Sequence, residues 1–134
     1  MRNVLWELPF PSSGAWTTRF QVLPRRECAI VFPNEVDQGR TNYLSLVFSG
    51  VQAYKCTYFH AITPVPEAYD TLIALEDSKW LDSIKHQMAA HGDDTSKLQH
   101  LIITFDDGPC YEFICESFQA KGPTTPANSA TTPK

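Results

Sequence analysis

Residues 98–118 read LQHLIITFDDGPCYEFICESF, and this stretch decides the fold. Two runs rich in β-branched and aromatic residues, 98–105 and 110–118, flank the tetrapeptide Asp-Asp-Gly-Pro. Asp-Gly between such runs is a strong signal of a β-hairpin, and Pro109 favours a loop of about three or four residues. We therefore predict a C-terminal β-hairpin whose turn requires a positive φ at Gly108.

An amphipathic helix is predicted before this hairpin, over residues 78–91. Either Asp77 or Ser78 is a good N-cap, and Gly92 is placed for the left-handed residue that often ends a helix. Apolar residues recur between these signals at helical spacing, namely Trp80, Leu81, Ile84 and Met88. We expect this apolar stripe to pack on one face of a sheet.

The remaining apolar runs are short and are separated by Pro, Gly and polar residues. They are found at residues 4–8, 16–23, 28–32, 43–48, 51–59 and 69–76. Ser49-Gly50 is interpreted as the turn of a two-residue hairpin, with Gly50 supplying a positive φ. We predict an α+β fold with one antiparallel sheet of six or seven strands, the helix on one face and the C-terminal hairpin.

The chain has 134 residues, of which 43% are hydrophobic, which is enough for one ordinary core. Residues 121–134 contain Thr, Pro, Ala, Ser, Asn and Gly but no large apolar side chain. Such a segment buries too little surface to offset its ordering entropy. We expect a single domain over residues 1–120, followed by a flexible tail over 121–134.

The charge of the chain limits the classes of partner. The net charge is −4, and the two charged residues after 120 are lysines (+2), so residues 1–120 carry −6. Nucleic-acid binding needs cationic residues and is therefore not expected, whereas a basic protein partner suits this charge. Arg25 and Arg26 are interpreted as solvated loop charges.

The apolar run at the start is interrupted at Glu7 and Pro9, so no signal peptide is predicted. No apolar stretch is long enough to cross a bilayer. We expect a cytoplasmic protein with no membrane partner.

The four cysteines of the chain form no C-x-x-C pair, and we expect them to be reduced. Two of them, Cys56 and Cys110, lie on predicted strands, as do His60 and His100. A thiol beside an imidazole is the minimum for a cysteine nucleophile. These four residues are the candidates for a catalytic pair, although no orienting residue stands at a recognisable spacing.

Carboxylates are the other candidate site residues. They cluster near the final hairpin and after the helix, at Asp93, Asp94, Asp106, Asp107 and Glu112. Asp-Asp-Gly-Pro is interpreted as turn chemistry, since the ligands of a calcium loop are incomplete. The glycine patterns of phosphate-binding loops do not occur either. We expect no cofactor and no metal, and we assign these carboxylates to contact with a basic partner.

The pattern Ser78-x-Trp80-Leu81, followed by the residues from His100 to Glu112, is similar to small bacterial proteins, some of which are encoded near toxin genes. This resemblance and the acidic charge favour a non-catalytic protein-binding module, of the immunity type that blocks a basic toxin. One alternative is a small hydrolase or thiol enzyme with a Cys/His pair. The other is a structural subunit of a larger assembly. The sequence contains no indication of the oligomeric state.

Overall fold

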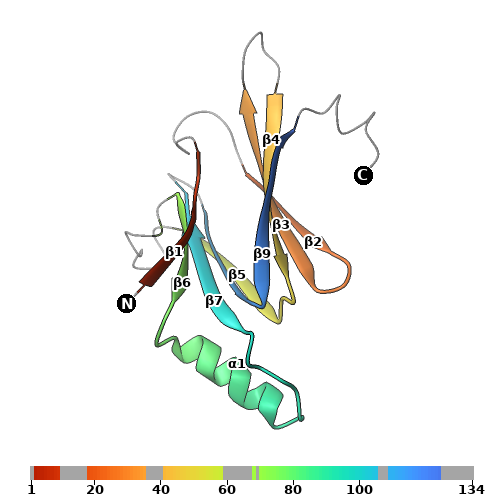
Figure 1. The fold of residues 1–134 in the computed structure, drawn as a ribbon, viewed down its shortest axis with the longest axis vertical. Coiled ribbons are helices and arrows are strands. Elements are labelled where there is room, and N and C mark those ends of the chain that lie inside the picture. Colours follow the sequence, from red (N-terminus) through yellow and green to blue (C-terminus); the bar gives the residue numbers. More distant parts are fainter. Residues whose placement is uncertain are drawn as a thin grey trace.

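The structure, a computed structural model, describes residues 2–9, 18–35, 41–58, 68, 70–105 and 109–124. These residues form nine β-strands and one α-helix (Figure 1). The strands are β1 (Arg2–Glu7), β2 (Arg19–Leu23), β3 (Glu27–Glu35), β4 (Thr41–Ser49), β5 (Ala53–Tyr58), β6 (Thr71–Leu75), β7 (Gln99–Thr104), β8 (Pro109–Cys115) and β9 (Ser117–Thr124). The helix is α1 (Lys79–Ala89).

The strands form two sheets in which neighbouring strands are antiparallel. Sheet A has five strands in the order β1-β6-β7-β8-β5, and sheet B has four strands in the order β2-β3-β4-β9. The predicted α+β class with antiparallel sheets is confirmed. The prediction of a single sheet of six or seven strands is replaced by nine strands in two sheets.

Two chain segments pass from one sheet to the other at a common corner. β4 ends at Ser49 in sheet B, and β5 begins at Ala53 in sheet A. Only Glu116 separates β8 from β9, and its N–H donates to the Ser49 carbonyl at 3.0 Å. Gly50 has φ +65°, and a Cβ on Gly50 would lie 2.7 Å from Glu116 Cγ. The glycine therefore permits both the bend and the close approach of the second segment.

The prediction that Ser49-Gly50 closes a hairpin is wrong. Gly50 has the expected positive φ, but β4 pairs with β3 and β9 whereas β5 pairs with β8. A dipeptide determines how sharply the chain bends. It does not determine which strands the two flanking segments pair with, because that pairing depends on distant parts of the chain.

The main hydrophobic core lies between the facing surfaces of the two sheets. Phe48 of β4 stacks on Phe113 of β8 with ring centroids 3.9 Å apart, and Phe32 of β3 meets Phe105 edge-on at 5.2 Å. The other buried members of this cluster are Cys28, Ile30, Leu44, Leu46, Val51, Leu72, Leu101, Ile103, Tyr111 and Cys115. Each fully buried large side chain contributes about 1.5–3 kcal/mol, so this interface between the sheets carries most of the hydrophobic stabilisation.

The hairpin predicted from residues 98–118 is confirmed as β7 and β8, but its second strand ends at Cys115 and not at Phe118, because Ser117 and Phe118 pair with β4 in sheet B. Thr104 lies opposite Cys110 at its closed end, and the N–H of Phe105 donates to the carbonyl of Pro109 at 3.2 Å. The predicted positive φ of Gly108 lies outside the described residues. Both faces of this hairpin are covered, because Ile102 and Cys110 belong to a second buried cluster on the face of sheet A turned away from sheet B.

Helix α1 has the predicted ends but not the predicted packing. Ser78 is its N-cap, and the N–H of Asp93 donates to the carbonyl of Met88 after Gly92 has turned the chain with φ +84°. The helix lies beyond the ends of β6 and β7 (Figure 1), and none of its residues is buried. The expected burial of its apolar stripe on a sheet face is therefore not found, and of the four stripe residues it is Trp80 that meets sheet A, with its ring 5.2 Å from that of His100. No helix among the described residues is long and apolar enough to span a membrane.

Strand β9 continues beyond the expected domain boundary at residue 120. Lys121 pairs with Ser45, and Thr124 pairs with Tyr43 at the end of the β4–β9 ladder. Pairing in a ladder uses backbone groups, which a segment without large apolar side chains still possesses. Strand β9 therefore includes residues 121–124, whereas residues 125–134 lie outside the described part, so the flexible tail stays a prediction there.

Candidate functional sites

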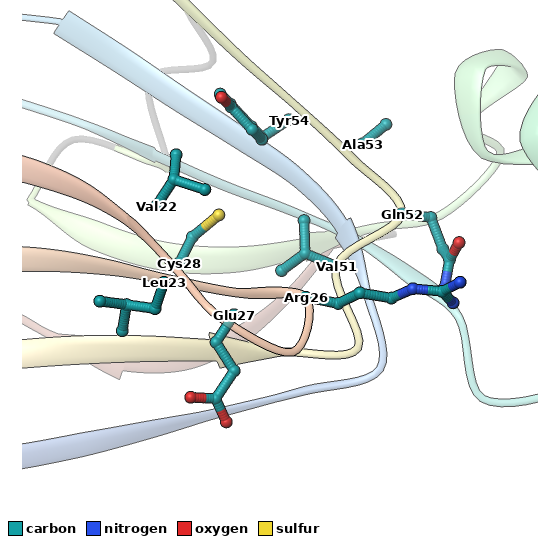
Figure 2. A pocket seen from close by; sticks show the side chains of 9 residues that line it. All are labelled: Val22, Leu23, Arg26, Glu27, Cys28, Val51, Gln52, Ala53 and Tyr54. Carbon is teal, nitrogen blue, oxygen red and sulfur yellow. The ribbon is translucent and has the colours of Figure 1, made fainter.

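A cleft opens between the free edges of two strands. Within the described part of the chain, β2 is one of the two outer strands of sheet B and β5 is one of the two outer strands of sheet A. The cleft between them has a volume of about 360 Å³. Figure 2 shows the residues that line it, which are Val22, Leu23, Arg26, Glu27, Cys28, Val51, Gln52, Ala53 and Tyr54.

The walls of this β2/β5 cleft are mainly apolar. Val22 on β2 is 62% exposed and Tyr54 on β5 is 46% exposed, so both rims present apolar surface to solvent. Phe20 packs against Tyr54 with ring centroids 5.1 Å apart, which joins the two strands across the core. Cys28 and Val51 form the buried part of the lining. Such a concave apolar surface, open to solvent, is typical of a binding site.

The turn between β2 and β3 places two arginines beside the cleft. Arg25 and Arg26 have φ of 64° and 60°, in the left-handed region that favours glycine. A residue with a Cβ costs about 1–2 kcal/mol in that region. The carbonyl of Arg26 accepts the N–H of Val51 at 2.9 Å, which ties the turn to the segment before β5. Figure 2 shows the Arg26 guanidinium at the end of the cleft where Gln52 lies.

A chain of polar contacts lies on the face of sheet A turned away from sheet B. Ser78 Oγ is 2.7 Å from His100 Nδ1, and His100 Nε2 is 2.8 Å from Glu112 Oε1. Lys55 Nζ is 4.0 Å from Glu112 Oε2 and 4.4 Å from the centroid of the Trp80 ring. His100 is only 6% exposed and Glu112 only 8%. These five side chains come from β5, β7, β8 and the start of α1, so the tertiary fold assembles them.

Local structure explains the positions of Ser78, His100 and Glu112 in this chain of polar contacts. Asp77 has φ 59° and turns the backbone from β6 into α1. Ser78 then caps the helix, and its Oγ accepts the N–H of Leu81 at 3.0 Å. His100 and Glu112 lie on the paired strands β7 and β8, where the alternation of side chains places both on the same face.

The buried carboxylate of Glu112 has compensating partners. Burying an ionised carboxylate without a partner costs several kcal/mol. His100 donates to one oxygen of Glu112, and the Lys55 ammonium lies near the other. The Trp80 ring meets His100 edge-on with centroids 5.2 Å apart and covers the imidazole. His100 and Glu112 are therefore the buried middle of this chain of polar contacts, between the half-buried Ser78 at one end and the exposed Lys55 at the other.

The structure does not bring the candidate thiols to His100. Both nitrogens of His100 have other partners, and Cys110 Sγ accepts the hydroxyl of Thr104 at 3.3 Å. Burial raises the pKa of the Cys110 thiol, and partial desolvation raises that of Cys56, although Cys56 is an exposed residue. Both sulfurs therefore favour the less reactive thiol form. His60 lies outside the described residues, so a pair that includes it stays a prediction.

The candidate carboxylates occupy different environments. Asp93 and Asp94 are exposed after α1, and the backbone N–H of Ser96 donates to Asp94 at 2.9 Å and lowers its pKa. Glu112 is buried in the polar chain, so its carboxylate does not lie on a surface with the other two. No three His, Cys, Asp or Glu side chains within the described ranges are grouped as metal ligands. Outside the described residues lie Asp106 and Asp107.

Two features of these sites were not predicted from the sequence. Ser78 was identified only as a helix cap, because 22 residues separate it from His100. The arginine pair at 25–26 was interpreted as loop charge, because the positive φ of both residues is not signalled by Gly, Asn or Asp at these positions.

Comparison of the chain with protein-family models, curated proteins and solved structures finds no match.

Proposed function

We propose that the protein is a binding module that takes an extended, mainly apolar segment of a partner protein in the β2/β5 cleft. The supporting observation is the pair of strand edges on either side of the cleft that have no partner strand among the described residues, with exposed Val22 on one and exposed Tyr54 on the other. A free edge offers backbone N–H and C=O groups to an added strand, and alternate side chains of that strand can enter the cleft.

The size of the cleft favours the side chains of an extended segment as its occupant over the surface of a folded protein. Its volume of about 360 Å³ is near the lower end of small-ligand sites, which span about 300–1,000 Å³. A few apolar side chains of an extended segment fill such a space, whereas a flat protein surface would leave it empty.

The charges at the cleft favour a carboxylate beside the apolar segment. Arg26 lines the cleft and is held in a strained turn, and Arg25 precedes it. The acid that lines the cleft, Glu27, already accepts the hydroxyl of Ser49 at 3.2 Å. Glycine would adopt this turn without strain, so the cost of arginine there is explained if the guanidinium contacts the ligand.

The wider partner remains a prediction from the charge of the chain. The net charge of −4 favours a basic protein and disfavours nucleic acid. An immunity-type role in the cytoplasm belongs to the same proposal. In that case the partner is basic overall and carries one acidic residue beside the segment that enters the cleft.

Selection from a random peptide library displayed on phage tests this function. The full chain serves as bait, and the library is first depleted on the Val22→Lys variant, which places a charge on the cleft wall at an exposed position. We expect enriched peptides with alternating apolar residues and one acidic residue. Synthetic versions of them should bind the Val22→Lys variant at least about tenfold more weakly, as expected when a charge displaces an apolar contact.

Val4→Lys is the matched control, because Val4 is also a valine on an outer strand of its sheet and is 57% exposed. This variant should bind the selected peptides as the unmodified protein does. The proposal is contradicted if no peptide is enriched, or if Val4→Lys and Val22→Lys reduce binding equally.

A further inference from the structure

We infer that Ser78, His100 and Glu112 form a nucleophilic relay, which transfers the acyl group of a carboxylic ester to Ser78 and then to water. Two consecutive short contacts carry this inference, 2.7 Å from Ser78 Oγ to His100 Nδ1 and 2.8 Å from His100 Nε2 to Glu112 Oε1. An ionised carboxylate only accepts hydrogen bonds, so Nε2 carries the proton. In the neutral ring Nδ1 then has a lone pair facing the Ser78 hydroxyl, which is the arrangement of a nucleophile and its general base.

This activity goes beyond the proposed binding function. None of the three residues lines the β2/β5 cleft, so the relay and the cleft are separate features of the molecule. Either one can be present without the other.

The backbone presents Ser78 at a sharp turn from a strand into a helix. Asp77, immediately before it, has φ 59°, which is a strained conformation for a residue with a Cβ. Strain of this kind persists where the surrounding structure holds it, and functional sites are a common location. Ser78 is half-buried while His100 and Glu112 are buried, so the hydroxyl is the part of the relay that a substrate can reach.

The first turn of α1 supplies donors for a developing negative charge. The helix has 11 residues, and its N-terminus carries a partial positive charge. No acceptor for the backbone N–H groups of Lys79 and Trp80 occurs among the described residues. Free N–H groups next to a nucleophile stabilise the oxyanion of a tetrahedral intermediate.

Capping of α1 does not by itself require this relay. The bond from the N–H of Leu81 to Ser78 Oγ already completes the cap. The buried His100–Glu112 pair adds a desolvation cost, which apolar residues of similar volume would avoid. Trp80 covers the His100 ring and limits the access of water to it, which strengthens the electrostatic effect of Glu112.

The reaction balances with water as the only co-reactant. Ser78 Oγ attacks the ester carbonyl carbon while His100 Nδ1 takes the hydroxyl proton. The tetrahedral intermediate expels the alcohol, which leaves with the proton from Nδ1, and the acyl group remains on Ser78. Water then attacks the acyl-serine, His100 again accepts and returns a proton, and the carboxylic acid departs. Glu112 accepts the Nε2 hydrogen bond throughout and stabilises the imidazolium.

Labelling of the full chain with a fluorophosphonate tests the relay, because an activated serine displaces fluoride from phosphorus. We expect one phosphonyl adduct by intact mass, and peptide mapping should place it on Ser78. Ser78→Asn keeps a good helix cap but lacks the nucleophile, so it should not be labelled. Ser83→Ala is the matched control, since Ser83 is an exposed serine on the same helix and its loss should change nothing.

The general base and the positioning residue have different signatures. His100→Gln should slow labelling at least about 100-fold, which is the usual contribution of general-base catalysis. Glu112→Gln should slow labelling of the folded protein, because a neutral amide stabilises the imidazolium less than the carboxylate that lies 2.8 Å from His100 Nε2. A merely structural role for Glu112 would lower stability and leave the labelling rate of the folded protein unchanged.

Circular dichroism checks that each variant is folded. The relay is overturned if the unmodified protein forms no adduct, if Ser83 is labelled as fast as Ser78, or if folded His100→Gln reacts at the original rate. Should His100→Gln fail to fold, the adduct position in the unmodified protein and the labelling rate of folded Glu112→Gln decide the question.

Discussion

Gly50→Ala is a test of the corner at which the chain passes between the sheets. Gly50 has φ +65°, where a residue with a Cβ costs about 1–2 kcal/mol. The new Cβ would also lie 2.7, 2.8 and 2.9 Å from Cγ, Cδ and Cβ of Glu116. Cγ and Cδ can rotate away, but Glu116 Cβ moves only with its backbone, which is bonded to Ser49. Overlap of this kind adds about 1–3 kcal/mol, so we expect the free energy of unfolding to fall by about 2–5 kcal/mol.

Gly92→Ala is a control that measures the cost of backbone strain without the cost of steric overlap. Gly92 has φ +84°, and a Cβ added there would meet no atom within 4 Å, so its substitution should cost the backbone strain alone, about 1–2 kcal/mol. In the double variant Gly50→Ala, Glu116→Gly the overlapping side chain is gone. The two changes should therefore be non-additive by about 0.5–3 kcal/mol, as for residues in contact.

Urea denaturation followed by circular dichroism measures these differences, and the slope m should stay constant across the series. Equal losses for Gly50→Ala and Gly92→Ala would refute the close approach of Glu116 to Gly50. Additive free-energy changes in the double variant would also refute this close approach, and the β4–β5 and β8–β9 connections would then not share a corner.

Two further predictions concern the thiols and the last strand. Iodoacetamide at pH 8 should modify exposed Cys56 first, whereas Cys115, whose pKa burial raises to about 12, should react only after unfolding. The protonated Cys115 thiol stabilises the folded state fully below its unfolded pKa of 9.0, and this stabilisation is lost as the pH rises toward 12. Rapid alkylation of Cys115 in the folded protein would contradict its assignment as a buried thiol. Truncation after Ala120 removes the pairs of β4 with Lys121 and Thr124, so the thermal midpoint should fall by about 2–8 °C relative to truncation after Thr124. An unchanged midpoint would show that this part of β9 contributes nothing to stability.

Local signals in the sequence determined the helix and the final hairpin. Ser78 and Gly92 mark the ends of α1 because a helix cap depends on residues within one turn of it. Residues 99–104 and 109–115 form β7 and β8 because the two runs are joined by a short turn and pair in register. In both cases the interacting residues are close along the chain, so the pattern of side chains is sufficient to predict the element.

The corner at Gly50 shows where local reasoning stops. The positive φ of Gly50 was predicted, yet the partners of the strands on either side were not. β4 pairs with β9, whose residues lie far along the chain, and that ladder competes with a local hairpin. The outcome depends on the total apolar surface that two facing sheets bury, which is a property of the whole chain.

Both candidate sites were decided by the tertiary structure. The β2/β5 cleft exists because two different sheets end at neighbouring edges, and no pattern within either strand encodes that gap. Ser78 meets His100, and His100 meets Glu112, only after β6, β7 and β8 have aligned. The sequence by itself supplied a helix cap, a strand histidine and a strand glutamate. Hydrogen bonds act over about 3 Å, so only the register of neighbouring strands could turn these three residues into one connected chain.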